Sequence, residues 1–170
     1  MKALIAGWAG TGKSTLALAL QAQGLPALDS DEVPDLSSWQ DLETGKTVQV
    51  DYSKPIDFDK LDWVWSPAVL ERVLAEHEEL FFCGNAANLW DFVDTFDVFF
   101  VFTIDTQTQR ERLMSRTNNV YGKEPSVLAY TLAAQKQFED RAINAGAVEL
   151  DATLPTESIV RQVLERTRAR

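Results

Sequence analysis

Short, almost continuously apolar runs alternate with segments of helical periodicity along most of the chain. The runs that predict strands are residues 2–6, 26–28, 79–83, 97–104 and 147–150. The segments that predict helices are residues 13–23, 67–78, 106–116, 125–145 and 156–168. Continuous apolar strands that alternate with helices are typical of a parallel sheet covered on both faces, so we predict a three-layer α/β fold with a five-stranded, mainly parallel sheet.

Residues 31–65 interrupt this alternation, because they are polar, contain prolines and are rich in aromatic residues. Within them, residues 41–50 predict a small hairpin that turns at Thr44-Gly45. Four large amphipathic rings lie in the segment, at Trp39, Tyr52, Trp63 and Trp65. Long loops are uncommon inside compact domains unless they carry function, so we predict that residues 31–65 bind a second ligand. The alternative is a solvated excursion whose tryptophans pack on the core.

Length and composition limit the function classes. The 170 residues predict a single domain, and the net charge of −10 argues against a broad nucleic-acid footprint, which needs clustered Lys and Arg. A lone cysteine, Cys83, excludes an internal disulfide and a cysteine-based zinc site. No apolar run approaches the about 18 residues of a membrane span, and no signal peptide is recognisable. We therefore expect a cytoplasmic protein.

A glycine-rich stretch, GWAGTGKST, follows the first predicted strand and opens the first predicted helix. Gly7, Gly12, Lys13 and Ser14 match the pattern G-x-x-x-x-G-K-[ST] at the required spacing. This pattern, between a strand and a helix, is typical of a phosphate-binding loop. A plain glycine turn between two core elements is the structural alternative.

The residue types of this loop suit a nucleotide. Glycines let the backbone N–H groups approach oxygen-rich phosphates at the positive end of a helix. Lys13 adds a mobile charge for the β- and γ-phosphates, and the Ser14 hydroxyl can bind Mg²⁺. We predict that ATP binds to a continuous run of residues, Gly10, Thr11, Gly12, Lys13, Ser14 and Thr15.

Two aspartates follow the second predicted strand, in the stretch LDSDE. Asp29 and Asp31 are two residues apart, so both point to one side of an extended chain. One carboxylate can hold Mg²⁺ and the other can accept a proton from an attacking hydroxyl or orient it. Acidic residues are also common in strand-to-helix loops, which is the alternative reading of this pair.

The chain resembles the small P-loop kinases, of the shikimate and gluconate kinase type, and the adenylate kinase-like ATPases. The resemblance rests on GWAGTGKST followed by LDSDE, on DVFFVFTIDTQTQRERLMSR and on VELDATLPTESIVRQVL. It covers residues 1–31 and 79–168 in order, whereas residues 32–78 match no part of the family. It implies a P-loop NTPase fold, MgATP as a ligand and a small-molecule acceptor. The assignment of that acceptor to residues 31–65 rests on the loop-length argument above.

Individual roles follow from the same resemblance. Arg112 is expected against the adenine, with Asp151 and Thr153 near the base, while Arg116 is expected to contact phosphate. The resemblance assigns Mg²⁺ to Asp29 together with Ser14, and the acceptor to Asp31. Residues 117–124 correspond to a short lid. Lys13, Asp31 and Arg116 are then the candidate catalytic residues.

The third predicted strand departs from the family pattern, because no acidic residue stands at its end. Asn85 and Asn88 follow it instead, and they can bind water or acceptor, or cap a helix end. Asp105 follows the fourth strand, where capping of the next helix is favoured over a magnesium role.

Three functions are compatible with these residues. The leading one is transfer of the γ-phosphoryl group of MgATP to a small hydroxyl or phosphate acceptor, a nucleoside, nucleotide or sugar acid. The second is an ATPase switch in which residues 31–65 bind a protein partner. The third is an end-specific polynucleotide kinase, against which the acidity of the chain argues.

Overall fold

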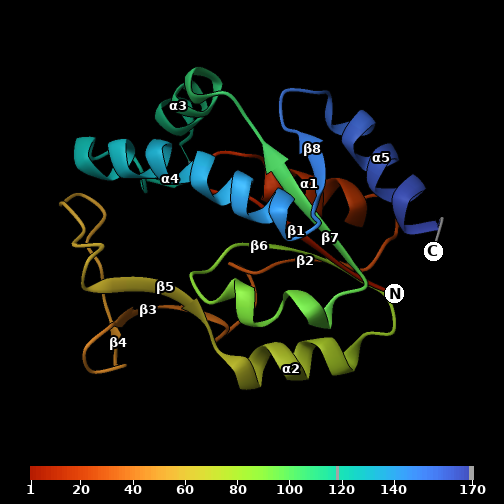
Figure 1. Ribbon diagram of the computed structural model, residues 1–170, viewed down its shortest axis with the longest axis horizontal. Helices are drawn as coiled ribbons and strands as arrows, with labels where there is room; N and C mark the ends of the chain where they lie inside the picture. The colour runs from red at the N-terminus through yellow and green to blue at the C-terminus, as the bar shows by residue number, and fades with distance from the viewer. Residues whose placement is uncertain (118, 169–170) are drawn as a thin grey trace.

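Five parallel strands form the central sheet of the protein, as the computed structural model shows for residues 1–117 and 119–168 (Figure 1). Their order in the sheet is β2-β6-β1-β7-β8, and every pairing between neighbours is parallel. The bounds are β1 Lys2–Ala6, β2 Ala27–Asp29, β6 Leu80–Gly84, β7 Val98–Thr103 and β8 Val148–Asp151. The predicted fold class is confirmed.

In the described part of the chain five helices accompany the sheet, and their bounds are α1 Lys13–Gln21, α2 Pro67–Glu76, α3 Thr106–Ser115, α4 Pro125–Asn144 and α5 Thr156–Arg168. Two 3-10 turns, η1 Leu89–Asp91 and η2 Val93–Thr95, precede β7. Helices α1 and α5 cover one face of the sheet, while α2 and α4 cover the other. The predicted ends of these helices and strands differ from the observed ones by at most two residues.

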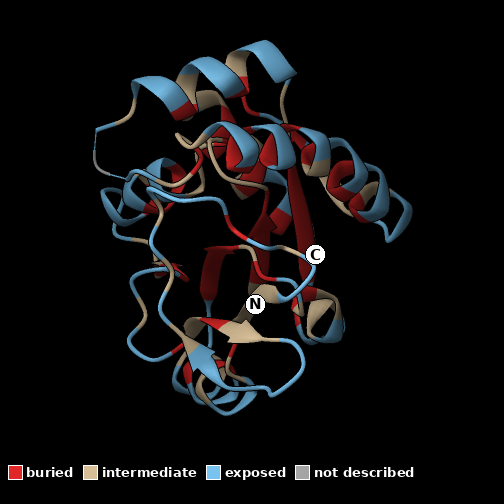
Figure 2. Ribbon diagram, turned by 90° about the vertical axis from the view of Figure 1, so that its left-hand side faces the viewer, coloured by how far each residue is buried: buried red, intermediate tan, exposed pale blue. Residues whose placement is uncertain are grey.

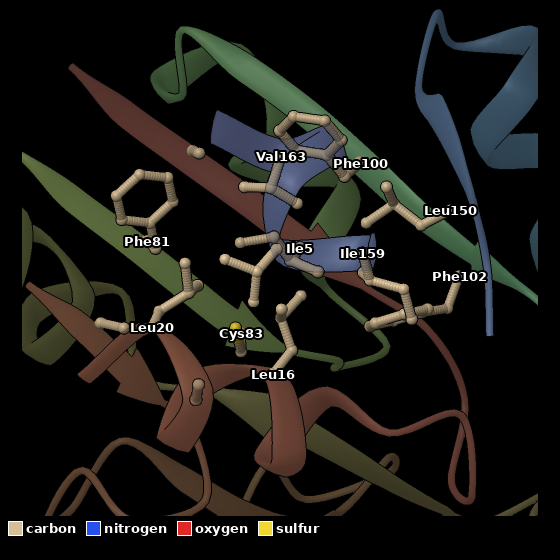
Figure 3. Packing of buried hydrophobic residues seen from close by; sticks show 14 of the residues in the cluster. Ile5, Leu16, Leu20, Phe81, Cys83, Phe100, Phe102, Leu150, Ile159 and Val163 are labelled. Carbon is tan, nitrogen blue, oxygen red and sulfur yellow. The ribbon is translucent and has the colours of Figure 1, made fainter. Parts of the chain in front are cut away.

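Strand residues alternate between two cores, one on each face of the sheet. Ile5 and Phe100 pack against α1 and α5, through contacts with residues such as Leu16 and Val163 (Figure 3). Leu4 and its neighbours on the opposite face pack against α2 and α4. Because both faces are covered, the central strands are buried while the outer surfaces of the helices are exposed (Figure 2).

A second, antiparallel sheet forms within residues 31–65 and lies beside the central sheet (Figure 1). It consists of β3 (Ser37–Asp41), β4 (Thr47–Val48) and β5 (Leu61–Trp65), in the order β4-β3-β5. The predicted hairpin is confirmed, with Gly45 at a φ of 68° in its turn. Strand β5 was not predicted, since its charged and aromatic residues have no strand-like alternation and its partner lies far along the chain.

Two sets of contacts hold residues 31–65 against the rest of the domain. Asn88, after β6, accepts a hydrogen bond from the Trp65 N–H and donates one to the Trp65 carbonyl, both at 2.9 Å. On the other side, Trp39 and Ile56 pack against Val127 of α4. Residues 31–65 are therefore a folded part of the domain, and Trp65 is buried in the core, as the alternative expected.

No helix in the described part of the chain combines the length and the apolar character needed to cross a bilayer.

Candidate active site

The loop between β1 and α1 is shaped by glycines. Gly10 and Gly12 have φ values of 86° and 103°, a region that other residues adopt at a cost. At Gly7 the limit is space, because a Cβ atom would come within 2.7 Å of the Thr11 hydroxyl. That hydroxyl donates a 2.8 Å hydrogen bond to the Trp8 carbonyl, which closes the turn. The loop therefore has the compact form that brings successive N–H groups to a phosphate.

Lys13 begins α1 and folds back over the loop, where its ammonium donates a 3.1 Å hydrogen bond to the Trp8 carbonyl. Burial lowers the pKa of this ammonium, while the nearby carboxylates of Asp31 and Asp29 act in the opposite direction. The Lys13 ammonium is therefore poorly hydrated and lies close to both aspartates.

Two glutamines support the loop from outside, and sequence reasoning missed both. Gln109 of α3 is fully buried and donates a 2.8 Å hydrogen bond to the Ala9 carbonyl. Gln135 of α4 accepts a 3.2 Å hydrogen bond from the Trp8 N–H. No pattern in the sequence marks them, because each lies a hundred or more residues from the loop that it contacts.

The two aspartates lie at the end of β2, as predicted, but in different surroundings. Asp29 is buried, and its carboxylate accepts a 3.0 Å hydrogen bond from the Asp31 N–H. Asp31 is an exposed residue that lines the cavity described below, where neighbouring protein atoms partly desolvate its carboxylate. This desolvation raises the pKa of Asp31, against the influence of Lys13 and of hydrogen bonds from Ser30 and Trp63. Trp63 belongs to β5, so the small sheet directly contacts the carboxylate.

Arg112 links the phosphate loop to the turn after β8. Its guanidinium donates to the Thr11 carbonyl at 3.4 Å and to the Ala152 carbonyl at 2.7 Å. Its contact with the adenine stays a prediction.

Asp151 and Thr153 shape that turn, since the Asp151 carboxylate accepts hydrogen bonds from the N–H and the hydroxyl of Thr153, at 2.8 and 2.6 Å. The residues of the turn region that line the cavity are Ala152, Leu154 and Thr156. Asp151 and Thr153 border a separate hollow beside Glu139. Their contact with the base stays a prediction.

Arg116 follows α3 and reaches the expected lid. Its guanidinium donates to the Tyr121 carbonyl, and its partial burial lowers the pKa, an effect that Tyr121 and Asp31 oppose. The Tyr52 and Tyr121 rings meet edge-on with centroids 5.7 Å apart, so the segment contacts the loop that follows β4. Asn118, within the expected lid, lies outside the described residues. Lys123 is half-buried and is not among the described residues that line the cavity.

A single cavity of about 550 Å³ joins these groups. The phosphate loop, Asp31, Arg112 and Arg116 line one end. The other end is lined by aromatic rings, those of Trp39, Tyr52, Phe58, Trp63, Tyr121 and Tyr130. The cavity is therefore large enough for more than a phosphate group, and it extends from the phosphate loop to the small sheet.

The end of β6, which lacks an acidic residue, is packed closely against Ser30 and Trp65. A Cβ atom at Gly84 would lie 2.4 Å from the Ser30 hydroxyl and 2.8 Å from the Trp65 ring, so no side chain fits there. Asn85 comes next and lines the cavity, and its buried Oδ1 has no hydrogen-bond partner among the described residues. Asn88 instead holds Trp65, whereas Asp105 caps α3 by accepting a 2.9 Å hydrogen bond from the Thr108 N–H.

Oxygen atoms for a divalent cation lie around Lys13. The Ser14 hydroxyl lies in the loop, the Asp29 and Asp31 carboxylates are close by, and the Asn85 carbonyl is unsatisfied. In the described residues, no group of three or more His, Cys, Asp or Glu side chains could hold a metal ion. Such oxygens suit Mg²⁺, which keeps several waters and binds few protein carboxylates together with substrate phosphates.

Solved structures with the same architecture are found, although no protein-family model and no curated protein sequence matches the chain. A shikimate kinase from Bacteroides thetaiotaomicron aligns over 99% of this chain and 98% of its own, with a TM-score of 0.63 and 14% identity. A gluconokinase from Sinorhizobium meliloti 1021 aligns over 96% and 89%, with a TM-score of 0.57 and 20% identity. The fold is that of the small P-loop kinases.

A deoxyadenosine kinase from M. mycoides with bound dATP also shares this fold. It aligns over 99% of this chain and 100% of its own, with a TM-score of 0.57 and 15% identity. These three proteins act on unlike molecules, so the fold leaves the second ligand of this chain undetermined.

Proposed function

We propose that the protein is a phosphotransferase that moves the γ-phosphoryl group of MgATP to a hydroxyl group of a small acceptor. The observation that carries the proposal is the single cavity, which runs from the phosphate loop past Asp31 to the aromatic side chains of the small sheet. An enzyme that transfers a group between two substrates needs both in one cavity with the catalytic groups between them. The named kinases of the same fold are consistent with this role.

The donor end of the cavity is proposed to bind ATP. The N–H groups of the loop from Gly10 to Thr15 would hold the phosphates, with Lys13 as the mobile cation. Arg112 would lie against the adenine, because its guanidinium bridges the loop and the Ala152 turn. Asp151 and Thr153 would act from behind that turn, by fixing its shape near the base.

Magnesium would be held by the Ser14 hydroxyl and, through water, by Asp29, and when bound it would neutralise charge on the transferred phosphoryl group. Asp29 is buried and held by the Asp31 N–H, so its carboxylate keeps one orientation. The unsatisfied Asn85 carbonyl is placed to accept a hydrogen bond from a water in the same region, in place of the absent strand-end acid.

Asp31 is proposed to orient the acceptor hydroxyl and accept its proton. The hydroxyl oxygen forms a bond to the γ-phosphorus, and the bond from that phosphorus to the β,γ-bridging oxygen breaks. ADP leaves with the electron pair. Lys13 and Arg116 would stabilise the charge on the phosphoryl oxygens, since both cations already lie close to Asp31.

The test is nucleotide binding followed by an acceptor screen. Calorimetry should detect MgATP binding, and Lys13→Ala should weaken it by roughly 10- to 100-fold, because one charge-assisted contact is lost while the loop amides remain. Lys46→Ala, on the exposed hairpin, is the matched control. ATP consumption is then followed with nucleosides, nucleotides, sugars and sugar acids. No nucleotide binding by the wild-type protein would refute the proposal.

The switch and polynucleotide alternatives predict other results in the same assays. An ATPase switch would hydrolyse ATP slowly without any acceptor. Its rate of ATP hydrolysis would respond to a protein partner rather than to a small molecule. A polynucleotide kinase would label the ends of DNA or RNA. The extension of the cavity among the rings of the small sheet favours a small acceptor over both.

A further inference from the structure

Two of the cations that line the cavity contact the phosphate loop. Among the described residues, the cavity is lined by the cations of Lys13, Arg112 and Arg116. Each of them is hydrogen-bonded to backbone carbonyls of the phosphate loop, of the Ala152 turn or of the lid. Lys13 and Arg112 are therefore held at the phosphate loop, whereas Arg116 is held at Tyr121, whose ring belongs to the aromatic part of the cavity.

The lysines of the small sheet and its loops lie outside the cavity. Lys54 and Lys60 pair with Asp51 and Asp57, at 3.2 and 3.1 Å, and are largely exposed. Lys46 is exposed in the hairpin turn. Within the described residues, none of the three lines the cavity. Within the described residues, the small sheet and its loops therefore offer no cation to a carboxylate or phosphate on the acceptor, whose desolvation beside them is costly.

Asp62 gives the acceptor end a negative charge instead. It belongs to β5, lines the cavity and is half-buried. Its carboxylate has neither a hydrogen bond nor an ion pair within the described part of the chain. Desolvation raises the pKa of Asp62, and the negative charge of Asp62 contributes to the raised pKa of Tyr130. A desolvated carboxylate facing a cavity is satisfied by a ligand that donates N–H or O–H bonds.

The aromatic rings that line the cavity are ordered against one another. Phe58 and Tyr130 are stacked, with centroids 3.7 Å apart and planes 5° from parallel. Trp39 donates a 2.9 Å hydrogen bond to the Tyr52 hydroxyl and lies 5.7 Å from the Trp63 ring. Such aromatic walls suit the CH face of a sugar ring or a planar base, and they attract cations rather than anions.

We propose, on the basis of the phosphotransferase function above, that the acceptor is an uncharged or cationic ring-bearing alcohol whose N–H or O–H donors bind Asp62, and that the site rejects sugar acids and nucleotides. Asp62 is then a specificity-determining residue. Its carboxylate attracts the hydrogen-bond donors of the acceptor and repels anionic groups.

The experiment compares acceptors that differ in charge on one ring. Glucosamine, glucose and glucuronate form one series, and deoxyadenosine and its 3′-phosphate form another. Phosphorylated product is measured with the wild-type protein, with Asp62→Asn and with Asp62→Lys, while Asp59→Asn is the control for an exposed aspartate of the same segment. Thermal unfolding is recorded for each variant.

We expect the uncharged or cationic members to be preferred over their anionic partner by roughly 10- to 100-fold in kcat/KM. Asp62→Asn should raise the KM for the preferred acceptor about tenfold or more with little change in MgATP affinity, whereas Asp59→Asn should leave both unchanged. Asp62→Lys should lower the KM for the anionic member.

Preference of the wild-type protein for an anionic member would overturn the inference, as would an unchanged KM in Asp62→Asn, and the phosphotransferase function would stand in either case. Failure to form a phosphorylated product from any acceptor class would instead refute the proposed function and the inference with it.

Discussion

Lys13 and Asp31 are groups of opposite charge that line one cavity, and desolvation disfavours the charged form of each. The pKa of Lys13 is lowered and that of Asp31 is raised, while each residue favours the charged form of the other. Opposed pKa shifts of this kind are common at functional sites. Such a pair contributes little to the stability of the fold, because the cost of desolvation offsets the attraction between the charges. The pair is expected to act on the substrates rather than to hold the fold together.

Asp31→Asn tests the role of this carboxylate. Turnover of the identified acceptor should fall by about 10² or more, the usual loss for a removed base, while MgATP affinity is retained. In the wild-type protein the acid limb of the kcat/KM profile should lie above pH 3.8, the ordinary carboxyl pKa, because the pKa is raised and only the ionised form accepts a proton. Unchanged turnover would make Asp31 a residue of the loop alone.

The same substitution should affect stability in the opposite sense. A carboxyl with a raised pKa in the folded state binds its proton more tightly there, so its ionised form destabilises the fold at neutral pH and stability is gained as the pH falls through that pKa. Asp31→Asn should therefore raise Tm at pH 7, and its advantage should shrink in acid. An equal Tm at both pH values would contradict this assignment of the shift.

At the scale of elements, β5 depends on Asn88. This side chain accepts from the Trp65 N–H and donates to the Trp65 carbonyl, so it completes the end of an edge strand that has a partner on one side only. Two residues of β5, Trp63 and Asp62, line the cavity. The position of the acceptor end therefore depends on an asparagine that lies outside the small sheet.

Asn88→Ala should lower the free energy of unfolding by about 1–3 kcal/mol, because two backbone groups lose a partner. For a domain of this size each 1 kcal/mol corresponds to roughly 2–4 °C in Tm. The KM for the acceptor should rise, with nucleotide affinity little changed. Asn144→Ala, at the exposed end of α4, is the control, and equal effects of the two substitutions would exclude the proposed attachment.

At the scale of the whole molecule, the two sheets and the segment after α3 meet around one cavity. Tyr121 contacts Tyr52 in the loop after β4, and the Tyr121 carbonyl accepts a hydrogen bond from Arg116. A ligand that contacts Arg116 and another that contacts the rings would thus act on the same segment. We expect this segment to close over the transferred group only when both ligands are bound, which would exclude water from the transfer.

Trypsin can test this closure, because Arg116 and Lys123 are cleavage sites at the two ends of the segment. Cleavage at both sites should be slowed several-fold by a non-hydrolysable ATP analogue together with the acceptor, and much less by either alone. Cleavage after Lys46, in the exposed hairpin, is the internal reference and should not change. Equal rates at all three sites under saturation would mean that the segment is a fixed turn.

Local patterns accounted for the central sheet, the helices and the phosphate loop. Apolar runs and helical periodicity reflect burial of each segment, and the glycines of the loop reflect backbone geometry that only neighbouring residues determine. The cap at Asp105 and the turn at Gly45 were predictable for the same reason. These features require no knowledge of distant contacts.

Tertiary structure decided the rest of the site. Strand β5 forms because β3 pairs with it in a register that sets Gln40 opposite Asp62, and this pairing leaves Asp62 in the cavity. Asn88 and Trp65 are 23 residues apart, and Gln109 and Gln135 reach the loop from 100 and 127 residues away. The sequence by itself determined the fold and the phosphate loop, because short-range patterns encode them. The acceptor end was decided only in three dimensions, since its charge and its walls come from segments that meet on folding.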